Sequence, residues 1–272
     1  MKENTTDIET EIKTDNKQNS DVVIEMQHLK KSFGSNHVLR DINLTINKGE
    51  NLAILGQSGT GKSVLIKCIV GLIDIDDCKL LIFVQDISEL KNKELVETQK
   101  RIGFLFQSGA LYDSMTVREN LEFPLRKQLH SISKEKLDSL IKESLHDVGL
   151  DKAINKTPSE LSGGMRKRLG LARTLILKPE IMLYDEPTTG LDPITSKEIS
   201  SLILELQKSL KMTSVVVTHD LLCAEIIADR AIVLNNGIVQ HEGTITELTT
   251  SSDPFLRNFF SHEIVEVQNR RN

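Results

Sequence analysis

The sequence has no tryptophan, few aromatic residues of any kind and no long apolar run. No apolar stretch approaches the roughly 20 residues of a helix that spans a bilayer, so we do not expect the chain to form a channel by itself. The first 20 residues contain several carboxylates and no apolar stretch, unlike a secretion signal. The net charge of −5, from 34 basic and 39 acidic residues, has the wrong sign for a protein that binds a nucleic-acid backbone.

Cysteine is also scarce. Cys68, Cys78 and Cys223 are an odd number of cysteines and show no C-x-x-C spacing. This pattern argues against a disulfide framework and a zinc site, and it suits a reducing compartment such as the cytoplasm. We expect each thiol to be a small buried side chain rather than a reactive group.

The chain is predicted to hold one main domain between two terminal segments. Residues 1–20 are too polar to bury a core, so we predict a disordered tail there. Residues 21–250 form the predicted main domain, and residues 251–272 form a C-terminal extension. Short apolar runs that begin at Val22 predict strands. An apolar stripe at helical spacing predicts a helical subdomain at about 110–178.

The second half of the main domain alternates strands and helices. Apolar runs at 181–184 and 215–217 flank a predicted helix at 193–210. This order of strand, helix and strand predicts a parallel pair of strands. Asn236 and Gly237, between two further apolar runs, predict a two-residue hairpin turn.

A glycine-rich segment matches the phosphate-binding pattern G-x-x-x-x-G-K-[ST] in full. It lies between a predicted strand and a predicted helix, as this pattern requires. The backbone N–H groups of such a turn converge on phosphate oxygens, its lysine neutralises them, and its serine hydroxyl ligates Mg²⁺. A chance glycine-rich turn is disfavoured by the flanking elements. The predicted nucleotide-contacting residues are Gly56, Gln57, Ser58, Gly59, Thr60, Gly61, Lys62, Ser63 and Val64.

Two adjacent carboxylates, Asp185 and Glu186, follow the apolar run IMLY. The C-terminal end of a strand is the usual ligand position in parallel α/β sheets. Asp185 is therefore a candidate for the Mg²⁺ shell, and Glu186 is a candidate for the catalytic base that polarises an attacking water. The acidic pair alone is weak evidence, but with the glycine-rich segment it predicts phosphoryl-transfer chemistry.

The segment LSGGM contains a second possible anion site. Ser162, Gly163 and Gly164 stand just ahead of a predicted helix, whose N-terminus favours negative charge. An ordinary N-cap followed by glycines is the alternative. One chain rarely needs two such sites for a single nucleotide.

The order of these motifs resembles that of the ABC ATPases over residues 22–250. The matching features are GQSGTGKS, Gln107, LSGGM, IMLYDEP, Leu191-Asp192 and His219. The resemblance implies an α/β fold: a P-loop NTPase (RecA-like) core with an N-terminal antiparallel β subdomain and an inserted helical subdomain. It also implies an ATPase that uses ATP and Mg²⁺ as a homodimer. Each nucleotide would lie between the phosphate loop of one subunit and the LSGGM helix of the other.

The same resemblance implies roles for four further residues. Phe33 would stack on adenine, Gln107 would link Mg²⁺ to a membrane partner, and His219 would contact the γ-phosphate. Asp192 would lie at the seam between the subunits. Simpler alternatives are a core position for Phe33, a loop position for Gln107 and a capped surface position for His219. For Asp192 the alternative is a place at a helix N-terminus.

Some stretches resemble, more narrowly, the ATPase of the Mla or Mce-associated phospholipid transporters. They are SGTGKSVLIKCIVGL, FQSGALYDSMTVRENLEFPLR, LSGGM and SSDPFLRNFF. This implies a multispanning permease and an Mce-domain protein as partners, phospholipid as cargo, and a place on the inner face of the cytoplasmic membrane. Cys78 and Val84 stand where family members usually have glycine, so we expect an altered local hairpin.

Two alternatives remain at this point. The core motifs do not encode cargo, so an ABC ATPase for amino acids, metal ions or lipoprotein release is the first. A soluble ABC protein that acts on nucleic acid or the ribosome is the second. The sequence disfavours it, because Lys62 and Ser162 are only 100 residues apart with no heptad array or cysteine cluster between them.

Overall fold

The computed structural model describes residues 21–129 and 131–261. The predicted disordered tail and the last eleven residues of the predicted C-terminal extension lie outside these ranges. In the described part of the chain, no helix combines the length and the apolar character needed to cross a membrane. The proposed division of the chain at residues 20 and 250 stays a prediction.

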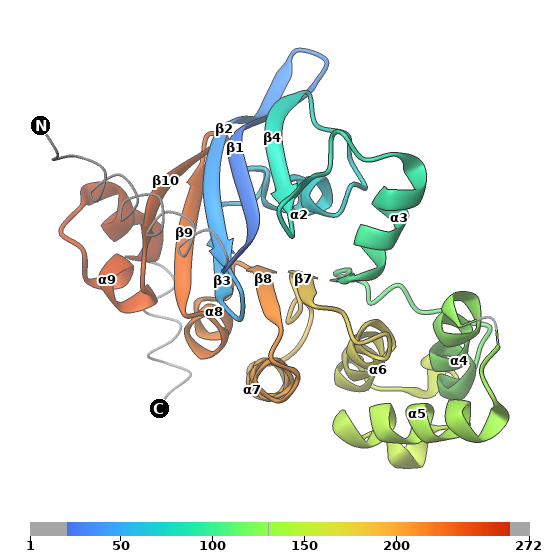
Figure 1. The fold of residues 1–272 in the computed structure, drawn as a ribbon. Coiled ribbons are helices and arrows are strands. Elements are labelled where there is room, and N and C mark those ends of the chain that lie inside the picture. Colours follow the sequence, from blue (N-terminus) through green and yellow to red (C-terminus); the bar gives the residue numbers. More distant parts are fainter. Residues whose placement is uncertain (1–20, 130, 262–272) are drawn as a thin grey trace, which may run out of the picture.

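One mixed sheet runs through the described residues in the order β5-β4-β1-β2-β10-β9-β3-β8-β7-β6 (Figure 1). One end of it is antiparallel and consists of β1 (Val22–Phe33), β2 (Asn36–Asn47), β4 (Asp77–Ile82) and β5 (Gln85–Asp86). The other end is parallel and consists of β9 (Arg230–Asn235), β3 (Asn51–Leu55), β8 (Thr213–Val217), β7 (Ile181–Asp185) and β6 (Ile102–Leu105). Between them, β10 (Ile238–Gly243) pairs antiparallel with β9.

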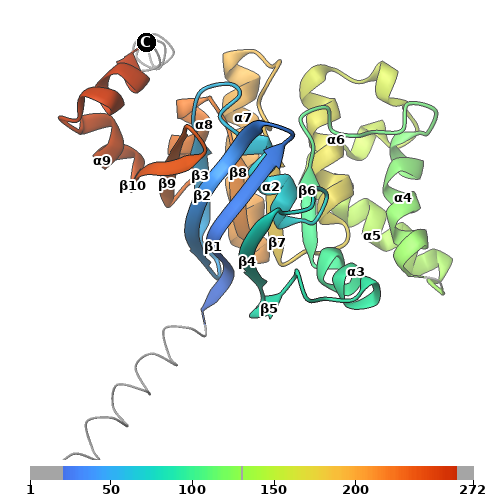
Figure 2. The ribbon, with the colours of Figure 1, turned by 90° about the horizontal axis from the view of Figure 1, so that it is seen from above.

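Helices cover both faces of this sheet. The ones beside the sheet are α2 (Lys62–Ile69), α3 (Asn92–Lys100), α7 (Pro193–Leu210), α8 (Leu221–Ile227) and α9 (Ile245–Thr250). Inserted between β6 and β7 are α4 (Val117–Gln128), α5 (Lys134–Asp147), two 3-10 turns (Asp151–Ala153 and Pro158–Glu160) and α6 (Gly163–Leu175). Figures 1 and 2 show α4, α5 and α6 gathered at one end of the molecule and α9 at the other.

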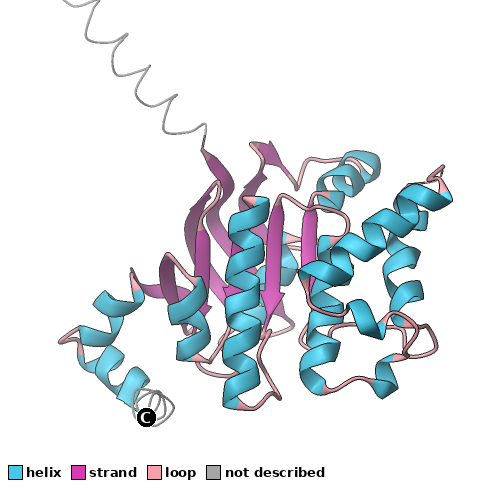
Figure 3. Ribbon diagram, turned by 90° about the horizontal axis from the view of Figure 1, so that it is seen from below, coloured by secondary structure: helices cyan, strands magenta, loops and turns pink. Residues whose placement is uncertain are grey.

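Alternate residues of the central strands pack into different cores. All five residues of β3, β7 and β8 are buried, as expected for parallel strands with both faces covered. Ile181 and Leu183 pack with the antiparallel strands and α2, whereas Met182 and Tyr184 pack with the inserted helices and α7. Figure 3 shows α7 and α8 side by side on the second face. The α/β fold expected from the motifs, with antiparallel strands and inserted helices, is confirmed.

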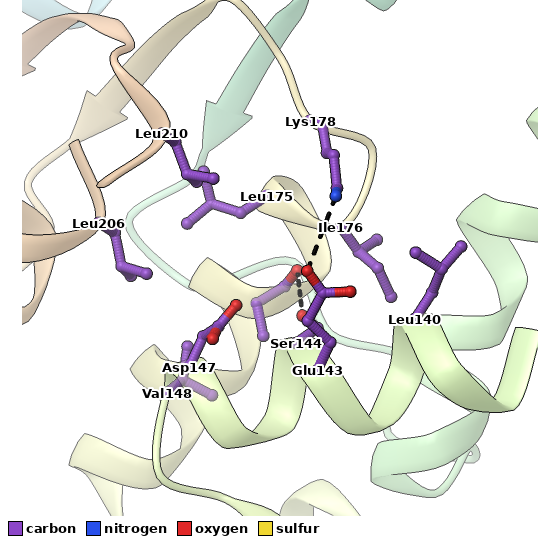
Figure 4. Close-up of a pocket in the computed structure, with 11 residues that line it drawn as sticks. Leu140, Glu143, Ser144, Asp147, Val148, Leu175, Ile176, Lys178, Leu206 and Leu210 are labelled. Carbon is purple, nitrogen blue, oxygen red and sulfur yellow. Dashed lines mark hydrogen bonds and ion pairs between the residues drawn. The ribbon is translucent and has the colours of Figure 1, made fainter. Parts of the chain in front are cut away.

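The inserted helices meet α7 around a small cavity, shown in Figure 4. Its volume is about 40 Å³, little more than a water molecule fills, and leucines such as Leu175, Leu206 and Leu210 line it. At its rim, Nζ of Lys178 lies 3.7 Å from Oε1 of Glu143. The cavity is a packing gap between helices and is too small for a metabolite.

Both hairpin turns that the sequence singled out have two residues. Asn236 and Gly237 both adopt positive φ angles between β9 and β10, and Asn235 pairs with Ile238, as the Asn-Gly pattern predicts. Phe83 and Val84 form the equivalent turn between β4 and β5, with φ angles of 51° and 68°. The missing glycine therefore does not prevent the hairpin. It leaves a β-branched residue in the left-handed region, which is a strained position.

The cysteines behave largely as expected. Cys68 and Cys223 are buried and Cys78 is half-buried, and none forms a disulfide with a described residue. Burial raises the pKa of the Cys68 and Cys223 thiols to about 12. Both thiols are therefore protonated and unreactive at neutral pH.

Candidate functional site

The glycine-rich segment joins the end of β3 to the start of α2. A Cβ atom on Gly56 would lie 2.5 Å from the carbonyl oxygen of Leu234, so only glycine fits there. Gly61 precedes α2 with a φ of 102°, and a Cβ would collide with the side chain of Leu39. These two glycines let the backbone wrap tightly around an open space. The helix N-terminus of α2 points its N–H groups at that space, where an anion is favoured.

Lys62 bends back over this loop. Its ammonium donates hydrogen bonds to the carbonyl oxygens of Gly56 and Gln57, at 2.7 and 3.0 Å. The side chain is 7% exposed, so a buried positive charge sits at the centre of the loop. Thr60, a predicted nucleotide contact, donates from its hydroxyl to the Gln57 carbonyl at 2.9 Å. It does not line the cleft described below.

The predicted metal-binding hydroxyl and carboxylate meet each other. Oγ of Ser63 donates to Oδ1 of Asp185 at 2.7 Å, although the two residues are 122 positions apart. Asp185 is the last residue of β7 and is only 6% exposed. A buried carboxylate paired with a hydroxyl is the oxygen-donor set that Mg²⁺ prefers. Among the described residues, no group of three or more His, Cys, Asp or Glu side chains could hold a metal ion.

Glu186 follows directly and adopts a φ of 52°, in the left-handed region that few non-glycine residues enter. Its backbone N–H is held by the Val217 carbonyl at 2.9 Å. Its Oε2 lies 2.8 Å from Nδ1 of His219 and accepts a hydrogen bond from Thr189 Oγ1 at 3.3 Å. The unusual backbone angle thus turns Glu186 away from Asp185 and toward His219.

Lys62, Ser63, Glu186 and His219 line one cleft of about 840 Å³, a size typical of small-ligand sites, and Asp185, the hydrogen-bond partner of Ser63, lies outside the lining. Gln107 and the half-exposed Phe33 lie on its wall, so Phe33 is not a core residue. The sequence analysis missed three further lining residues, Val38, Thr189 and Phe259. The last comes from a helix at residues 254–261 in the predicted extension. Gly56, Gln57, Ser58, Gly59, Gly61 and Val64 complete the lining.

The LSGGM segment does not reach this cleft. Ser162 is the N-cap of α6, and its Oγ accepts a hydrogen bond from the Met165 N–H at 3.2 Å. Gly163 and Gly164 form the half-buried start of the helix, and Gly164 packs so closely on Thr195 that a Cβ would lie 2.6 Å from its methyl group. The segment is a helix start that lies apart from the cleft of its own chain, and its role as an anion site stays a prediction.

Asp192 also lies outside the cleft and caps α7. Its Oδ1 accepts hydrogen bonds from the N–H groups of Ile194 and Thr195, at 3.1 and 3.0 Å. The Thr195 hydroxyl donates to Oδ2 at 2.6 Å. This hydroxyl, together with the backbone donors, holds the pKa of Asp192 below its usual value. The simple helix-terminal alternative thus accounts for the contacts that Asp192 makes within one chain.

A further residue that the motifs did not indicate is Lys167, on α6. Its ammonium donates to the carbonyl oxygen of Gln107 at 2.5 Å and reaches that of Glu186 at 3.5 Å. Burial lowers its pKa, and the negative charges of Glu186 and Asp185 oppose that change. No sequence pattern could have indicated these contacts, because they join three segments that only the fold brings together.

Comparison with known proteins decides the family. The model of the ABC transporter family matches residues 39–189, more than half of the chain. The chain belongs to the ABC transporter family. It is an ABC ATPase, which binds ATP and couples its hydrolysis to transport.

Several relatives match almost the whole described chain. The probable ribonucleotide transport ATP-binding protein mkl of Mycobacterium leprae is 42% identical over 241 residues, which cover 88% of this chain and 69% of that protein. The intermembrane phospholipid transport system ATP-binding protein MlaF of Haemophilus influenzae is 39% identical over 241 residues, covering 89% and 91%. The methionine import ATP-binding protein MetN of Clostridium acetobutylicum is 36% identical over 226 residues, covering 83% and 70%.

Solved structures agree with this family. The cbiO1 protein of Clostridium perfringens, part of the ABC transporter complex cbiONQ, superposes with a TM-score of 0.78 and 27% identity over 92% of this chain and 96% of that one. A dimeric ATP-binding cassette in a post-hydrolysis state, bound to ADP and Pi, superposes with a TM-score of 0.74 and 32% identity over 82% and 98%.

Proposed function

We propose that this ABC ATPase energises the transport of phospholipid as a subunit of an Mla-type or Mce-associated transporter. The supporting observation is the similarity to MlaF of Haemophilus influenzae, which extends over 89% of this chain and 91% of that protein. The partners would be a multispanning permease and an Mce-domain protein. The ATPase would lie in the cytoplasm, on the inner face of the cytoplasmic membrane.

A different cargo is the main competing proposal. Relatives named for methionine import and for ribonucleotide transport are similar in identity, so identity alone does not select a substrate. Their match leaves about a third of each of those proteins uncovered, whereas MlaF is matched almost from end to end. The balance of acidic over basic residues still disfavours a partner with a nucleic-acid backbone.

The geometry of the cleft supports a division of labour among its residues. Lys62 and the N–H groups at the start of α2 would bind the β- and γ-phosphates, and Phe33 would stack on adenine. Ser63, Asp185 and the side chain of Gln107 would hold Mg²⁺, which neutralises phosphate charge when bound. The donor set fits this ion because each donor is an oxygen.

The hydrolytic step needs an activated water and a place for its proton. Glu186 is 13% exposed at the edge of the cleft, so its carboxylate would orient and polarise that water. His219 contacts the same carboxylate through Nδ1 and would present its other nitrogen to the γ-phosphate. The proton would pass from water to Oε of Glu186 as the oxygen attacks phosphorus and the bond to ADP breaks.

Two copies would be needed for complete sites. Within one chain, Ser162, Gly163 and Gly164 begin α6 away from the cleft, and a helix N-terminus favours an anion. In a face-to-face pair, this turn would close over the nucleotide bound by the other copy. Asp192 would lie at the same seam.

The test of cargo and partners is affinity isolation of the tagged full chain from membranes, followed by identification of the bound proteins and lipids. We expect a permease, an Mce-domain protein and phospholipid to co-purify in fixed ratio. A matched isolation with the Lys62→Ala chain should return the same proteins, because assembly does not need the phosphate contact. Recovery of a permease together with a solute-binding protein, and no Mce protein, would overturn the phospholipid proposal.

A further inference from the structure

The ammonium of Lys167 occupies an unusual position for a charged group. The residue is 9% exposed, and its contacts in the described part of the chain are two backbone carbonyls rather than a carboxylate. Burial of an ammonium costs free energy unless strong acceptors surround it. A position that served packing alone would be filled at lower cost by an apolar side chain. The ammonium is stabilised by these two carbonyl oxygens and by the nearby negative charges of Glu186 and Asp185.

Those two oxygens belong to two different segments of the site. One is the carbonyl of Gln107, which lies in the loop after β6 and lines the cleft. The other is the carbonyl of Glu186, whose left-handed backbone angle aims the proposed catalytic base. Lys167 thus contacts both the loop that contains Gln107 and the turn that contains Glu186, the proposed base.

Two further residues of α6 contact the loop that contains Gln107. Gly170 lies one turn further along the helix, and a Cβ there would be 3.2 Å from Cα of Gly109. Another turn along, Arg173 donates through Nη1 to the carbonyl of Ala110 at 2.6 Å. The helix and the loop are therefore in contact over three successive turns. A shift or rotation of α6 must move the loop with it.

The two ends of this contact face different nucleotides. On the proposed arrangement of two copies, the N-terminus of α6 touches the ATP held by the partner, whereas Lys167 on the second turn of the same helix holds the chain's own Gln107 and Glu186. We propose that Lys167 is a positioning residue that couples the two ATP sites of a pair. Binding of ATP at one site fixes the position of α6, and Lys167 on that helix fixes the orientation of the catalytic base at the other site. This inference rests on the proposed pairing of two copies.

The experiment compares hydrolysis by the full chain with three variants. Lys167→Met keeps the length of the side chain and removes its charge, whereas Lys167→Arg keeps the charge. Arg168→Met is the matched control, because Arg168 is the next residue on α6 and its partners, the Val148 carbonyl and the Glu198 carboxylate, both lie outside the cleft lining. The readouts are kcat, KM, the Hill coefficient for ATP and the affinity for ATP when hydrolysis is prevented by EDTA. Thermal unfolding shows whether each variant is folded.

We expect Lys167→Met to lower kcat by about 10- to 100-fold, with ATP affinity in EDTA unchanged. Its Hill coefficient should fall to about 1, the value for independent sites. Lys167→Arg should recover most of the rate and the cooperativity, and Arg168→Met should behave as the wild type does. A folded Lys167→Met variant with the wild-type rate and Hill coefficient would overturn the proposal. So would an equal loss in Arg168→Met. If Lys167→Met does not fold, Lys167→Arg decides: recovered folding with lost cooperativity contradicts the coupling role, and retained cooperativity supports it.

Failure of the pairing itself is distinguishable. If the rate per chain of the wild type does not depend on protein concentration and its Hill coefficient is about 1, the two-copy arrangement is wrong and the coupling falls with it. If the wild type is cooperative and Lys167→Met is equally so, the pairing stands and only the role of Lys167 is wrong.

Discussion

The hydroxyl of Ser63 and the carboxylate of Asp185 form a 2.7 Å hydrogen bond across the space between α2 and the end of β7. This contact joins the phosphate loop to the acidic pair, which the sequence separates by 122 positions. It holds the two proposed oxygen ligands of Mg²⁺ close to each other. Preorganised ligands lower the cost of binding, so removal of either one should be felt in the metal dependence of the reaction.

We predict that Asp185→Asn lowers Mg²⁺-dependent hydrolysis by about 100-fold or more. The substitution removes the carboxylate from the proposed Mg²⁺ shell, whose other ligands are neutral protein oxygens and phosphate. Titration of the ATPase rate with Mg²⁺ should show a higher half-saturating concentration. Asp86→Asn, in the exposed β4–β5 hairpin, is the control. An unchanged Mg²⁺ requirement in Asp185→Asn would show that this carboxylate is not a metal ligand.

We predict that Glu186→Gln slows hydrolysis by a factor on the order of 10² to 10⁴ while ATP still binds, because the amide cannot accept the proton of the attacking water. The same variant should accumulate as an ATP-bound pair, which size-exclusion chromatography with light scattering detects. Glu205→Gln, on the exposed side of α7, should have no effect. Unchanged turnover would show that Glu186 is not the base. A Glu186→Gln variant that stays monomeric with ATP and Mg²⁺, both alone and beside its membrane partner, would contradict the pairing of two copies.

We predict that Phe33→Ala and Phe259→Ala each weaken ATP binding by about tenfold, the usual worth of one aromatic contact with a base. Inorganic pyrophosphate should bind both variants as it binds the wild type, because the phosphate loop is intact. Phe123→Ala is the control, since Phe123 contacts Tyr112 at a centroid distance of 5.0 Å and does not line the cleft. Equal losses for pyrophosphate and ATP would mean that Phe259 supports the loop instead of the nucleoside.

We predict that Val84→Gly raises the stability of the protein. A β-branched residue at a φ of 68° is strained by about 1–3 kcal/mol, and glycine removes this strain at an entropic cost of about 0.5–1 kcal/mol. Val84 is 70% exposed, so little packing is lost. Thermal unfolding should show a midpoint higher by about 2–4 °C. Asn236→Gly in the other hairpin is the control and should change the midpoint less, because asparagine tolerates this conformation. A lower midpoint for Val84→Gly would show that the valine contributes packing that outweighs its strain.

The sequence was sufficient where local chemistry determines structure. The pattern from Gly56 to Ser63 indicated both the strand that precedes it and the helix that follows, and the apolar spacing predicted α7 at 193–210, which the structure confirms. Asn236 and Gly237 specified their turn for the same reason. In these segments the backbone angles and the period of apolar residues depend on neighbours in the chain.

The remainder depends on contacts between distant segments. Lys167 reads as an ordinary surface lysine of an amphipathic helix until the fold places Gln107 and Glu186 beside it. Phe259 reads as one of several apolar residues in a short helix, and only the sheet order brings it to the cleft. No spacing rule contains this information.

The join between the two ends of the sheet has a consequence for how the chain could diverge. In the described residues, β10 meets β2 at one ladder pair, Ile238 with Asp41, next to a hydrogen bond from the Arg40 N–H to the Gly237 carbonyl. Phe33 lies at the end of β1, on the antiparallel side of this β2–β10 pairing, whereas Lys62 begins α2, which follows β3 on the parallel side. In the proposed site, the ring of Phe33 and the ammonium of Lys62 are thus positioned by different parts of the sheet, so a substitution at Phe33 leaves the residues of the phosphate loop unchanged.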